Sequence, residues 1–191
     1  MKALVTGASS GIGLEISKYL DSIGYEIILV ARDKEKLESV AKTLTHKPKI
    51  IVMDLQQVED IKSLYVLVKN DDIDILVNNA GFGLFGNFTE TDLSKELNMI
   101  DINIKAVHIL TKLFLKDMKR KNKGYILNVA SSAAFQSGPL MATYYSTKSY
   151  VYRLTEAINY ENKKDKVNVQ VSCLCPGPVD TNFNKVAGVR F

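Results

Sequence analysis

Short apolar runs alternate with amphipathic segments along the whole chain. Six of these runs are rich in Val, Ile and Leu at consecutive positions, which is typical of β-strands covered on both faces. The predicted strands are Lys2–Thr6, Glu26–Ala31, Lys49–Met53, Ile73–Val77, Tyr125–Ala130 and Val167–Cys173.

The segments between these runs carry apolar residues at helical spacing. Leu14, Ile16 and Leu20 mark the first predicted helix, and the two longest helices are expected at residues 92–120 and 142–162. Five strand–helix units followed by a sixth strand predict a parallel sheet with right-handed crossovers. We therefore expect one α/β domain that spans residues 1–191.

Composition narrows the class of protein. The chain has 191 residues, of which 46% are hydrophobic and 24% charged, a balance that argues against disorder. The net charge of +4 is too small to indicate a nucleic-acid partner by itself. Lysine clusters at residues 116–123 and 163–166 fall where helices should end and cations are favoured, with an anionic-surface patch as the alternative.

The sequence carries no signal for export, membrane insertion or metal binding. Its apolar runs are shorter than the ~20 residues of a membrane span, and its N-terminus becomes polar too early for a signal peptide. Cys173 and Cys175 are expected to be small core residues, and His46 and His108 are isolated from each other and from them. We expect a cytoplasmic protein without a metal.

A glycine-rich turn follows the first predicted strand. The segment Thr6–Gly13 reads T-G-A-S-S-G-I-G and leads into a helix, which is the setting of a nucleotide-phosphate site. Gly7 would make the tight turn, Gly11 would let the backbone approach a pyrophosphate, and Gly13 would let helix and strand pack closely. The spacing G-x-x-x-G-x-G differs from the common G-x-G-x-x-G dinucleotide motif.

This spacing resembles that of the short-chain dehydrogenase/reductase family. The resemblance implies a three-layer, Rossmann-type, doubly wound parallel sheet that binds a nicotinamide dinucleotide. Arg32, at the end of the second strand, stands where relatives that prefer NAD place an aspartate, and a guanidinium suits the 2′-phosphate of NADP. We predict NADP(H) rather than NAD, although Asp33 could turn toward the ribose instead.

Tyr144 and Lys148 form a candidate catalytic pair. They stand at i and i+4 on a predicted helix, so their side chains share one face. A neighbouring ammonium lowers the pKa of a phenol, which suits a general acid/base for an alcohol–carbonyl interconversion. By the same family resemblance, Ser131 binds the substrate oxygen and Asn103 holds a water in a proton relay. Tyr145 and Ser132 are one-residue alternatives, which the family spacing disfavours.

The resemblance covers residues 1–181 and also implies the cofactor contacts. Asp54 and Leu55 resemble the adenine contact, the Asn78–Gly81 turn passes close to the cofactor, and the segment after the sixth strand holds the nicotinamide carboxamide. The implied cofactor-binding residues are Gly7, Ser9, Ser10, Gly11, Ile12, Gly13, Arg32, Asp54, Leu55, Asn79, Ala80, Gly81, Tyr144, Lys148, Pro176, Gly177, Val179 and Thr181.

Relatives usually continue beyond this last segment with a substrate lid and a seventh strand. We therefore expect six strands, no lid and a chain truncated at its C-terminus. The resemblance also implies a homodimer or homotetramer that pairs through the two longest helices.

The predicted activity is hydride transfer between NADP(H) and a carbonyl/alcohol pair. The loops at residues 82–86 and 135–141 are apolar and lack lysine and arginine, which favours a small hydrophobic substrate, unless these residues pack beneath a lid. A 3-oxoacyl reductase is the nearest named alternative. A non-catalytic NADP(H)-binding sensor or scaffold on the same fold is the other alternative.

Overall fold

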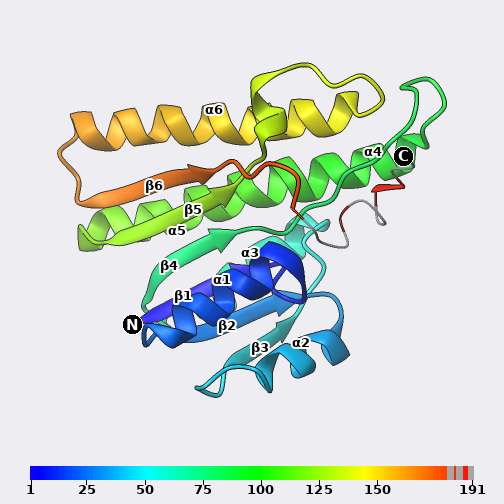
Figure 1. Ribbon diagram of the computed structural model, residues 1–191. Helices are drawn as coiled ribbons and strands as arrows, with labels where there is room; N and C mark the ends of the chain where they lie inside the picture. The colour runs from blue at the N-terminus through cyan, green and yellow to red at the C-terminus, as the bar shows by residue number, and fades with distance from the viewer. Residues whose placement is uncertain (180–182, 184–186, 189–191) are drawn as a thin grey trace.

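In the computed structural model, which describes residues 1–179, 183, 187 and 188, six parallel strands form one sheet (Figure 1). The strands are β1 Lys2–Thr6, β2 Glu26–Ala31, β3 Lys49–Val52, β4 Ile73–Asn78, β5 Gly124–Val129 and β6 Val169–Leu174. The α-helices are α1 Gly11–Ser22, α2 Lys34–Ala41, α3 Val58–Val68, α4 Leu93–Ile100, α5 Val107–Lys121 and α6 Ala142–Lys164. All six predicted strands are present, and their ends agree within two residues.

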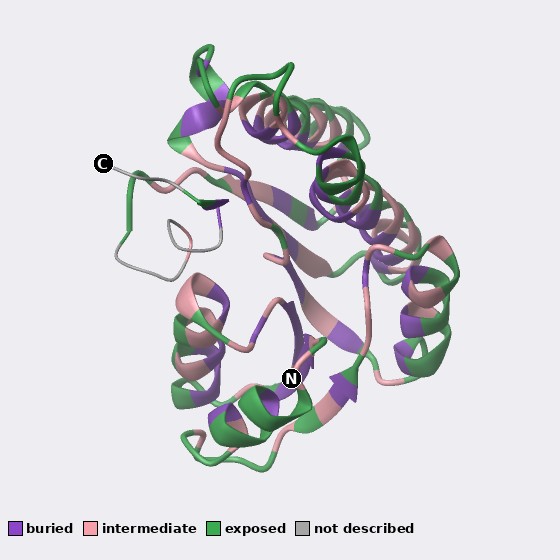
Figure 2. Ribbon diagram, turned by 90° about the vertical axis from the view of Figure 1, so that its right-hand side faces the viewer, coloured by how far each residue is buried: buried purple, intermediate pink, exposed green. Residues whose placement is uncertain are grey.

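The helices cover both faces of the sheet, and the molecule has three layers (Figure 2). The side chains of β1 point alternately to the two faces of the sheet. Ala3 and Val5 pack in the core under α1 and α2, and Leu4 packs in the core under α3 and α5. Because both faces are buried, consecutive strand positions are apolar. The predicted three-layer doubly wound sheet is therefore confirmed.

The strand order is β3-β2-β1-β4-β5-β6, so the connections run in opposite directions from β1 and β4. Crossovers of one hand then place α1 and α2 on one face and α3, α5 and α6 on the other, and the loops after β1 and β4 diverge. This divergence leaves a crevice at the carboxyl ends of the strands, where open α/β sheets bind their ligands.

The region expected as one helix at residues 92–120 is interrupted. A π-helical segment, Asp101–Ala106, joins α4 to α5 end to end. Single π-helical turns within longer helices are frequent at functional sites, and this one contains Asn103.

Buried amides and hydroxyls fix β4 and β5 to the helices behind the crevice. The Asn78 side chain donates to Thr111 of α5 and to Asn128 of β5, and Asn128 donates to Thr155 of α6. Each of these four side chains is almost wholly buried. These buried hydrogen bonds hold the strand ends in register below the site.

None of the described helices is long and apolar enough to cross a membrane. Cys173 and Cys175 are free thiols whose sulfur atoms are 3.8 Å apart. Both are half-buried, so the expectation of buried core residues holds only in part: they pack at the edge of the core between β6 and α6.

Candidate active site

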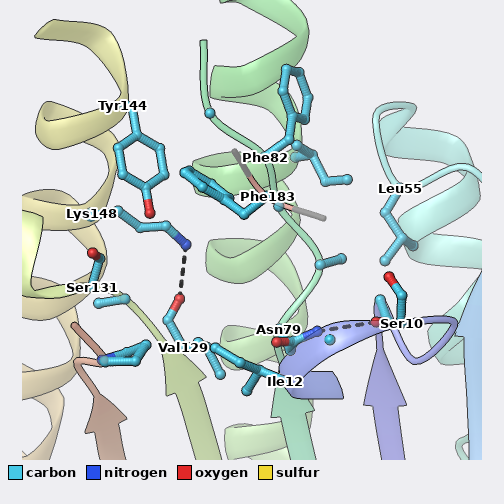
Figure 3. A pocket seen from close by; sticks show the side chains of 18 of the residues that line it. Ser10, Ile12, Leu55, Asn79, Phe82, Val129, Ser131, Tyr144, Lys148 and Phe183 are labelled. Atoms are coloured by element: carbon cyan, nitrogen blue, oxygen red, sulfur yellow. Dashed lines mark hydrogen bonds between the residues drawn. The ribbon is translucent and has the colours of Figure 1, made fainter. Parts of the chain in front are cut away.

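A cavity of about 920 Å³ opens at the carboxyl ends of the strands (Figure 3). Most of the predicted site residues line it: Gly7, Ser9, Ser10, Gly11, Ile12, Arg32, Leu55, Asn79, Ala80, Gly81, Ser131, Tyr144, Lys148, Pro176, Gly177 and Val179. Gly13, Asp54 and Asn103 do not belong to its lining, and Thr181 lies outside the described residues. The fold therefore brings residues that are distant in sequence together around one cavity.

The glycine turn packs directly against the loop after β4. Gly7 has φ +63°, and a Cβ on it would lie 2.8 Å from Ala80 Cα. A Cβ on Gly13 would collide with the Gly7 carbonyl oxygen and the Asn79 amide. The Asn79 side chain donates to the carbonyls of Thr6 and Gly7, and so fixes the turn from the neighbouring strand. Glycine is therefore required at both positions, because neighbouring backbone and side-chain atoms leave no room for a Cβ.

The N-terminus of α1 faces the cavity and suits an anion. Ser10 is the N-cap residue, but its side chain makes no capping hydrogen bond, and the first turn of α1 contains no acidic residue. Gly11 and Ile12, whose backbone amides belong to this first turn, line the cavity. Unpaired amides and the helix dipole together favour a phosphate group.

Asp33 is already engaged by the helix that follows it. It is the N-cap residue of α2, where its Oδ1 accepts a hydrogen bond from Lys36 N at 3.0 Å. This hydrogen bond and the Lys36 side chain lower the pKa of Asp33. Arg32 stays 60% exposed at the cavity, with Nη1 4.0 Å from Asp54 Oδ2. The arrangement therefore leaves Arg32, rather than Asp33, to meet a ligand.

Ser131, Tyr144 and Lys148 converge on one part of the cavity (Figure 3). Lys148 is 7% exposed and donates from Nζ to Val129 O at 3.0 Å, with Nζ 5.8 Å from the Tyr144 ring centroid. Ser131 Oγ accepts from Ala133 N at 3.1 Å, which fixes the oxygen. The loop after β5 and helix α6 thus bring a hydroxyl, a phenol and an ammonium together.

Burial controls the ionisation of this group. Desolvation lowers the pKa of Lys148 to about 8. Desolvation also raises the pKa of Tyr144, and the Ser131 side chain opposes this rise only in part. The Tyr144 pKa is therefore raised rather than lowered as expected, because burial of the phenol outweighs the hydrogen bond from Ser131. Tyr144 is protonated at neutral pH.

The Lys148 shift predicts how stability depends on pH. Between pH about 8 and about 10.5 the unfolded chain keeps a proton that folded Lys148 has lost, so the free energy of unfolding should rise through this window. Lys148→Met lacks this contribution, which is on the order of 3 kcal/mol. Urea unfolding of both proteins at pH 7 and pH 10 measures this. From pH 7 to pH 10, the free energy of unfolding should rise more for the wild type than for the variant. Parallel pH profiles would contradict the shift.

Asn103 lies behind the cavity wall, and its side chain makes three hydrogen bonds within the protein. Its Oδ1 accepts from Phe82 N, and its Nδ2 donates to Phe82 O and to Thr147 Oγ1, all at 3.0–3.1 Å. A Cβ on Gly81 would lie 2.7 Å from Asn103 Oδ1. In this structure the asparagine joins the loop after β4 to α6, and its part in a proton relay stays a prediction.

The phenol of Tyr144 is surrounded by apolar groups. Its neighbours in this cluster include Met99, Phe82, Leu84 and Met141. Phe183 lies beside it in the cavity, with ring centroids 5.1 Å apart. An apolar wall next to a proton donor favours an uncharged substrate.

Four charged or polar side chains of the lining were not among the sequence predictions. They are Lys36 of α2, Gln56 of the loop after β3, and Lys95 and Asn98 of α4. The loops lack lysine as predicted, but α4 brings Lys95 to the same space. Lys95 and Asn98 share one face of α4 at i and i+3, but this spacing does not show that the face meets the cavity, because the sheet orients the helix.

Comparisons with known proteins decide the family. A family model described as short chain dehydrogenase matches residues 1–188. The chain belongs to the short-chain dehydrogenase family. An uncharacterized oxidoreductase of Staphylococcus saprophyticus is 35% identical over 185 residues, covering 94% of this chain and 78% of the relative.

Solved short-chain dehydrogenases share the whole fold. A Sphingobium yanoikuyae enzyme in complex with NADPH has a TM-score of 0.92 at 27% identity, covering 99% of this chain and 75% of that one. The bulky-bulky ketone specific alcohol dehydrogenase of Comamonas testosteroni has a TM-score of 0.87 at 29% identity, covering 92% and 72%. As a short-chain dehydrogenase, the chain is an NAD(P)-dependent oxidoreductase of alcohols and carbonyl compounds.

Proposed function

We propose that this short-chain dehydrogenase uses NADP(H) to interconvert a small, uncharged, apolar carbonyl compound and its alcohol, with Tyr144 as the general acid/base. The observation that carries the proposal is the convergence of Ser131, Tyr144 and Lys148 on a cavity that continues to the glycine turn. This constellation provides the proton donor, the oxygen-binding hydroxyl and the dinucleotide site that the reaction requires.

The cavity residues fit NADP(H). The Gly7–Ile12 turn would hold the pyrophosphate, Leu55 the adenine, and Arg32 the 2′-phosphate. Lys148 would hold the nicotinamide ribose, because an ammonium has three donors and Val129 O takes only one. When bound, NADP(H) supplies or accepts the hydride. The similar Sphingobium yanoikuyae structure contains NADPH, which supports this choice of cofactor.

The protein residues handle the oxygen and the proton. Ser131, whose oxygen is fixed by Ala133 N, donates its hydroxyl hydrogen to the substrate carbonyl oxygen. Tyr144 donates its phenolic proton to the same oxygen as negative charge develops there. A phenol is protonated at neutral pH, and burial raises the Tyr144 pKa further, so Tyr144 can act as the acid in the reduction.

The apolar wall sets the expected substrate class. The purified chain should oxidise NADPH with hydrophobic ketones and aldehydes, and more slowly with carbonyl compounds of similar size that carry a carboxylate. Loss of NADPH absorbance measures both rates. Equal or faster turnover of the charged compounds would contradict the assignment to apolar substrates. If the wild type binds NADPH but turns over no substrate, a sensor or scaffold would be favoured.

Lys95 is the observation that favours the alternative, a 3-oxoacyl reductase. Acyl thioester substrates carry a phosphorylated arm, and Lys95 provides a cation in the cavity lining. A 3-oxoacyl thioester that is turned over faster than simple ketones, with this advantage lost in Lys95→Gln, would support the alternative.

Arg32 should decide the choice between NADP(H) and NAD(H). Arg32→Asp is expected to weaken NADPH binding about 10–100-fold and to leave NADH binding equal or tighter, because a carboxylate repels the 2′-phosphate and accepts from a ribose hydroxyl. Fluorescence titration of both cofactors measures this. An unchanged NADPH affinity would remove Arg32 from the site.

We also propose that the chain forms a homodimer or homotetramer through α5 and α6. A hydrogen bond between His108 of α5 and Tyr150 of α6 joins these helices, and exposed Phe135, in the turn after β5, meets Tyr152 of α6 edge to face. Aromatic side chains grouped at this surface suit an interface. Light scattering of the eluting protein measures its mass.

A further inference from the structure

Two thiols lie close together at the carboxyl end of β6. Cys173 belongs to β6 and Cys175 follows this strand, and their sulfur atoms are 3.8 Å apart. Side chains at i and i+2 of an extended segment point to the same face, which explains this approach. They are the only cysteines of the chain, and both are free and half-buried. Among the residues that the structure describes, no third histidine, cysteine or carboxylate completes a metal site around them.

The two thiols pack against the elements that carry the catalytic group. Both belong to a small apolar cluster that contains Ala130, the residue before Ser131, and Val151, which lies one turn after Lys148 on α6. Electrostatic interaction with the thiols partly offsets the effect of burial on the pKa of Lys148. Neither thiol lines the cavity, but a chemical change at the sulfur atoms is placed to affect the active site.

Two backbone hydrogen bonds connect the cysteine segment to the turn that holds Ser131. Leu174, which lies between the two cysteines, accepts from Ala130 N through its carbonyl oxygen at 2.8 Å. Pro176, directly after the pair, accepts from Ser132 N at 2.9 Å. These hydrogen bonds fix the residues on either side of Ser131. A shift of the cysteine segment would therefore move the Ser131 hydroxyl.

We propose that Cys173 and Cys175 form a reversible oxidation site, at which hydrogen peroxide converts the two thiols to a disulfide and so lowers turnover. The Cys175 sulfur attacks one peroxide oxygen, the O–O bond breaks and water leaves, which gives a sulfenic acid. The Cys173 sulfur then attacks the Cys175 sulfur, the S–O bond breaks, and a second water leaves with the Cys173 proton. In total, the two thiols lose two electrons and two protons, and one peroxide is reduced to two waters.

Cys175 takes the first step because Cys173 is a poor nucleophile. Burial and the neighbouring Cys175 raise the pKa of Cys173 to about 12, so Cys173 stays protonated at neutral pH. The thiolate is the form of cysteine that reacts with a peroxide. Cys173 lies 3.8 Å away, where it can resolve the sulfenic acid within the same chain.

Closing the disulfide requires the segment to contract. The sulfur atoms must approach from 3.8 Å to about 2.05 Å. Residues at i and i+2 of a strand have Cα atoms about 6.6 Å apart, close to the upper limit of roughly 6.8 Å for a disulfide. The contraction pulls on the carbonyl groups of Leu174 and Pro176, which hold the turn around Ser131. We therefore expect a strained disulfide that is easily reduced and that displaces a catalytic hydroxyl.

Peroxide treatment of the purified full chain tests the site, with mass, free thiols and turnover of an accepted ketone measured on the same samples. The oxidised wild type should lose both free thiols and two hydrogen atoms, form no covalent dimer, and turn over about 10–100-fold more slowly. Dithiothreitol should restore the thiols and the activity.

The two serine variants are matched controls. Cys175→Ser should keep turnover within a few-fold of the untreated wild type and should resist inactivation by peroxide. Cys173→Ser should form a sulfenic acid at Cys175 that a 1,3-diketone reagent traps, because the resolving thiol is missing. Equal inactivation of the wild type and Cys175→Ser would place the sensitive group elsewhere and overturn the inference.

The remaining outcomes separate this inference from the proposed function. If peroxide leaves both thiols of the folded wild type free, or links cysteines of two chains, the oxidation site is overturned and the proposed function stands. If the disulfide forms and turnover is unchanged, its effect on Ser131 is overturned. If the disulfide forms in a chain that turns over no substrate, the oxidation site stands and the proposed function is wrong.

Discussion

Replacing Tyr144 with phenylalanine should reduce turnover about 10²–10⁴-fold while NADPH still binds with nearly wild-type affinity. The substitution removes one oxygen atom, the proton donor, and keeps the ring that packs against Met141 and Phe183. A phenol is protonated at neutral pH, and burial raises the Tyr144 pKa further, so in the reduction direction it can supply the proton. Steady-state rates with an accepted ketone, together with a cofactor titration, measure both effects.

Tyr145 offers the matched control for this experiment. It is the next residue on α6, it lines the same cavity, and its ring centroid is 6.1 Å from that of Tyr144. Tyr145→Phe should keep turnover within a few-fold of the wild type. If the two variants exchanged behaviours, Tyr145 would be the acid, and if Tyr144→Phe turned over normally, the catalytic assignment would be lost.

Gly13→Ala is expected to have the second-largest effect, on both stability and cofactor binding. Helix propensity alone predicts that alanine at this position in α1 stabilises the protein by about 1 kcal/mol. The added Cβ, however, would collide with the Gly7 carbonyl oxygen and the Asn79 amide, which hold the glycine turn. We expect net destabilisation of about 2–3 kcal/mol and at least a tenfold loss of NADPH affinity.

The sign of the Gly13→Ala effect is therefore diagnostic. Urea unfolding and NADPH titration measure it, with Glu15→Ala as the control on the exposed face of the same helix. Glu15 pairs only with exposed Lys18, so this control should change the free energy of unfolding by less than about 0.5 kcal/mol. A stabilised Gly13→Ala protein that binds NADPH normally would show that the close packing of the turn is not required.

The strands and the glycine turn could be predicted because local chemistry determines them. Strands buried on both faces need continuous apolar runs, and Gly7 and Gly13 mark positions where a backbone approaches another backbone. The Tyr144–Lys148 pair was predicted from its i and i+4 spacing together with the family resemblance, since the spacing alone can occur by chance in any amphipathic helix.

The remaining features depend on tertiary contacts. Helical spacing of apolar residues continues through the π-helical segment Asp101–Ala106, so periodicity cannot reveal it. The raised pKa of Tyr144 results from burial by residues on several elements, which no spacing encodes. Lys36 and Lys95 line the cavity because α2 and α4 are oriented by the sheet.

The most direct test of the account is a titration of NADPH and NADH against the purified chain, followed by cofactor fluorescence and by thermal shift. The account predicts saturable binding of both cofactors, with NADPH bound more tightly and its advantage lost in Arg32→Asp. Absence of binding by either cofactor, in protein shown to be folded, would contradict the assignment of the cavity as a dinucleotide site.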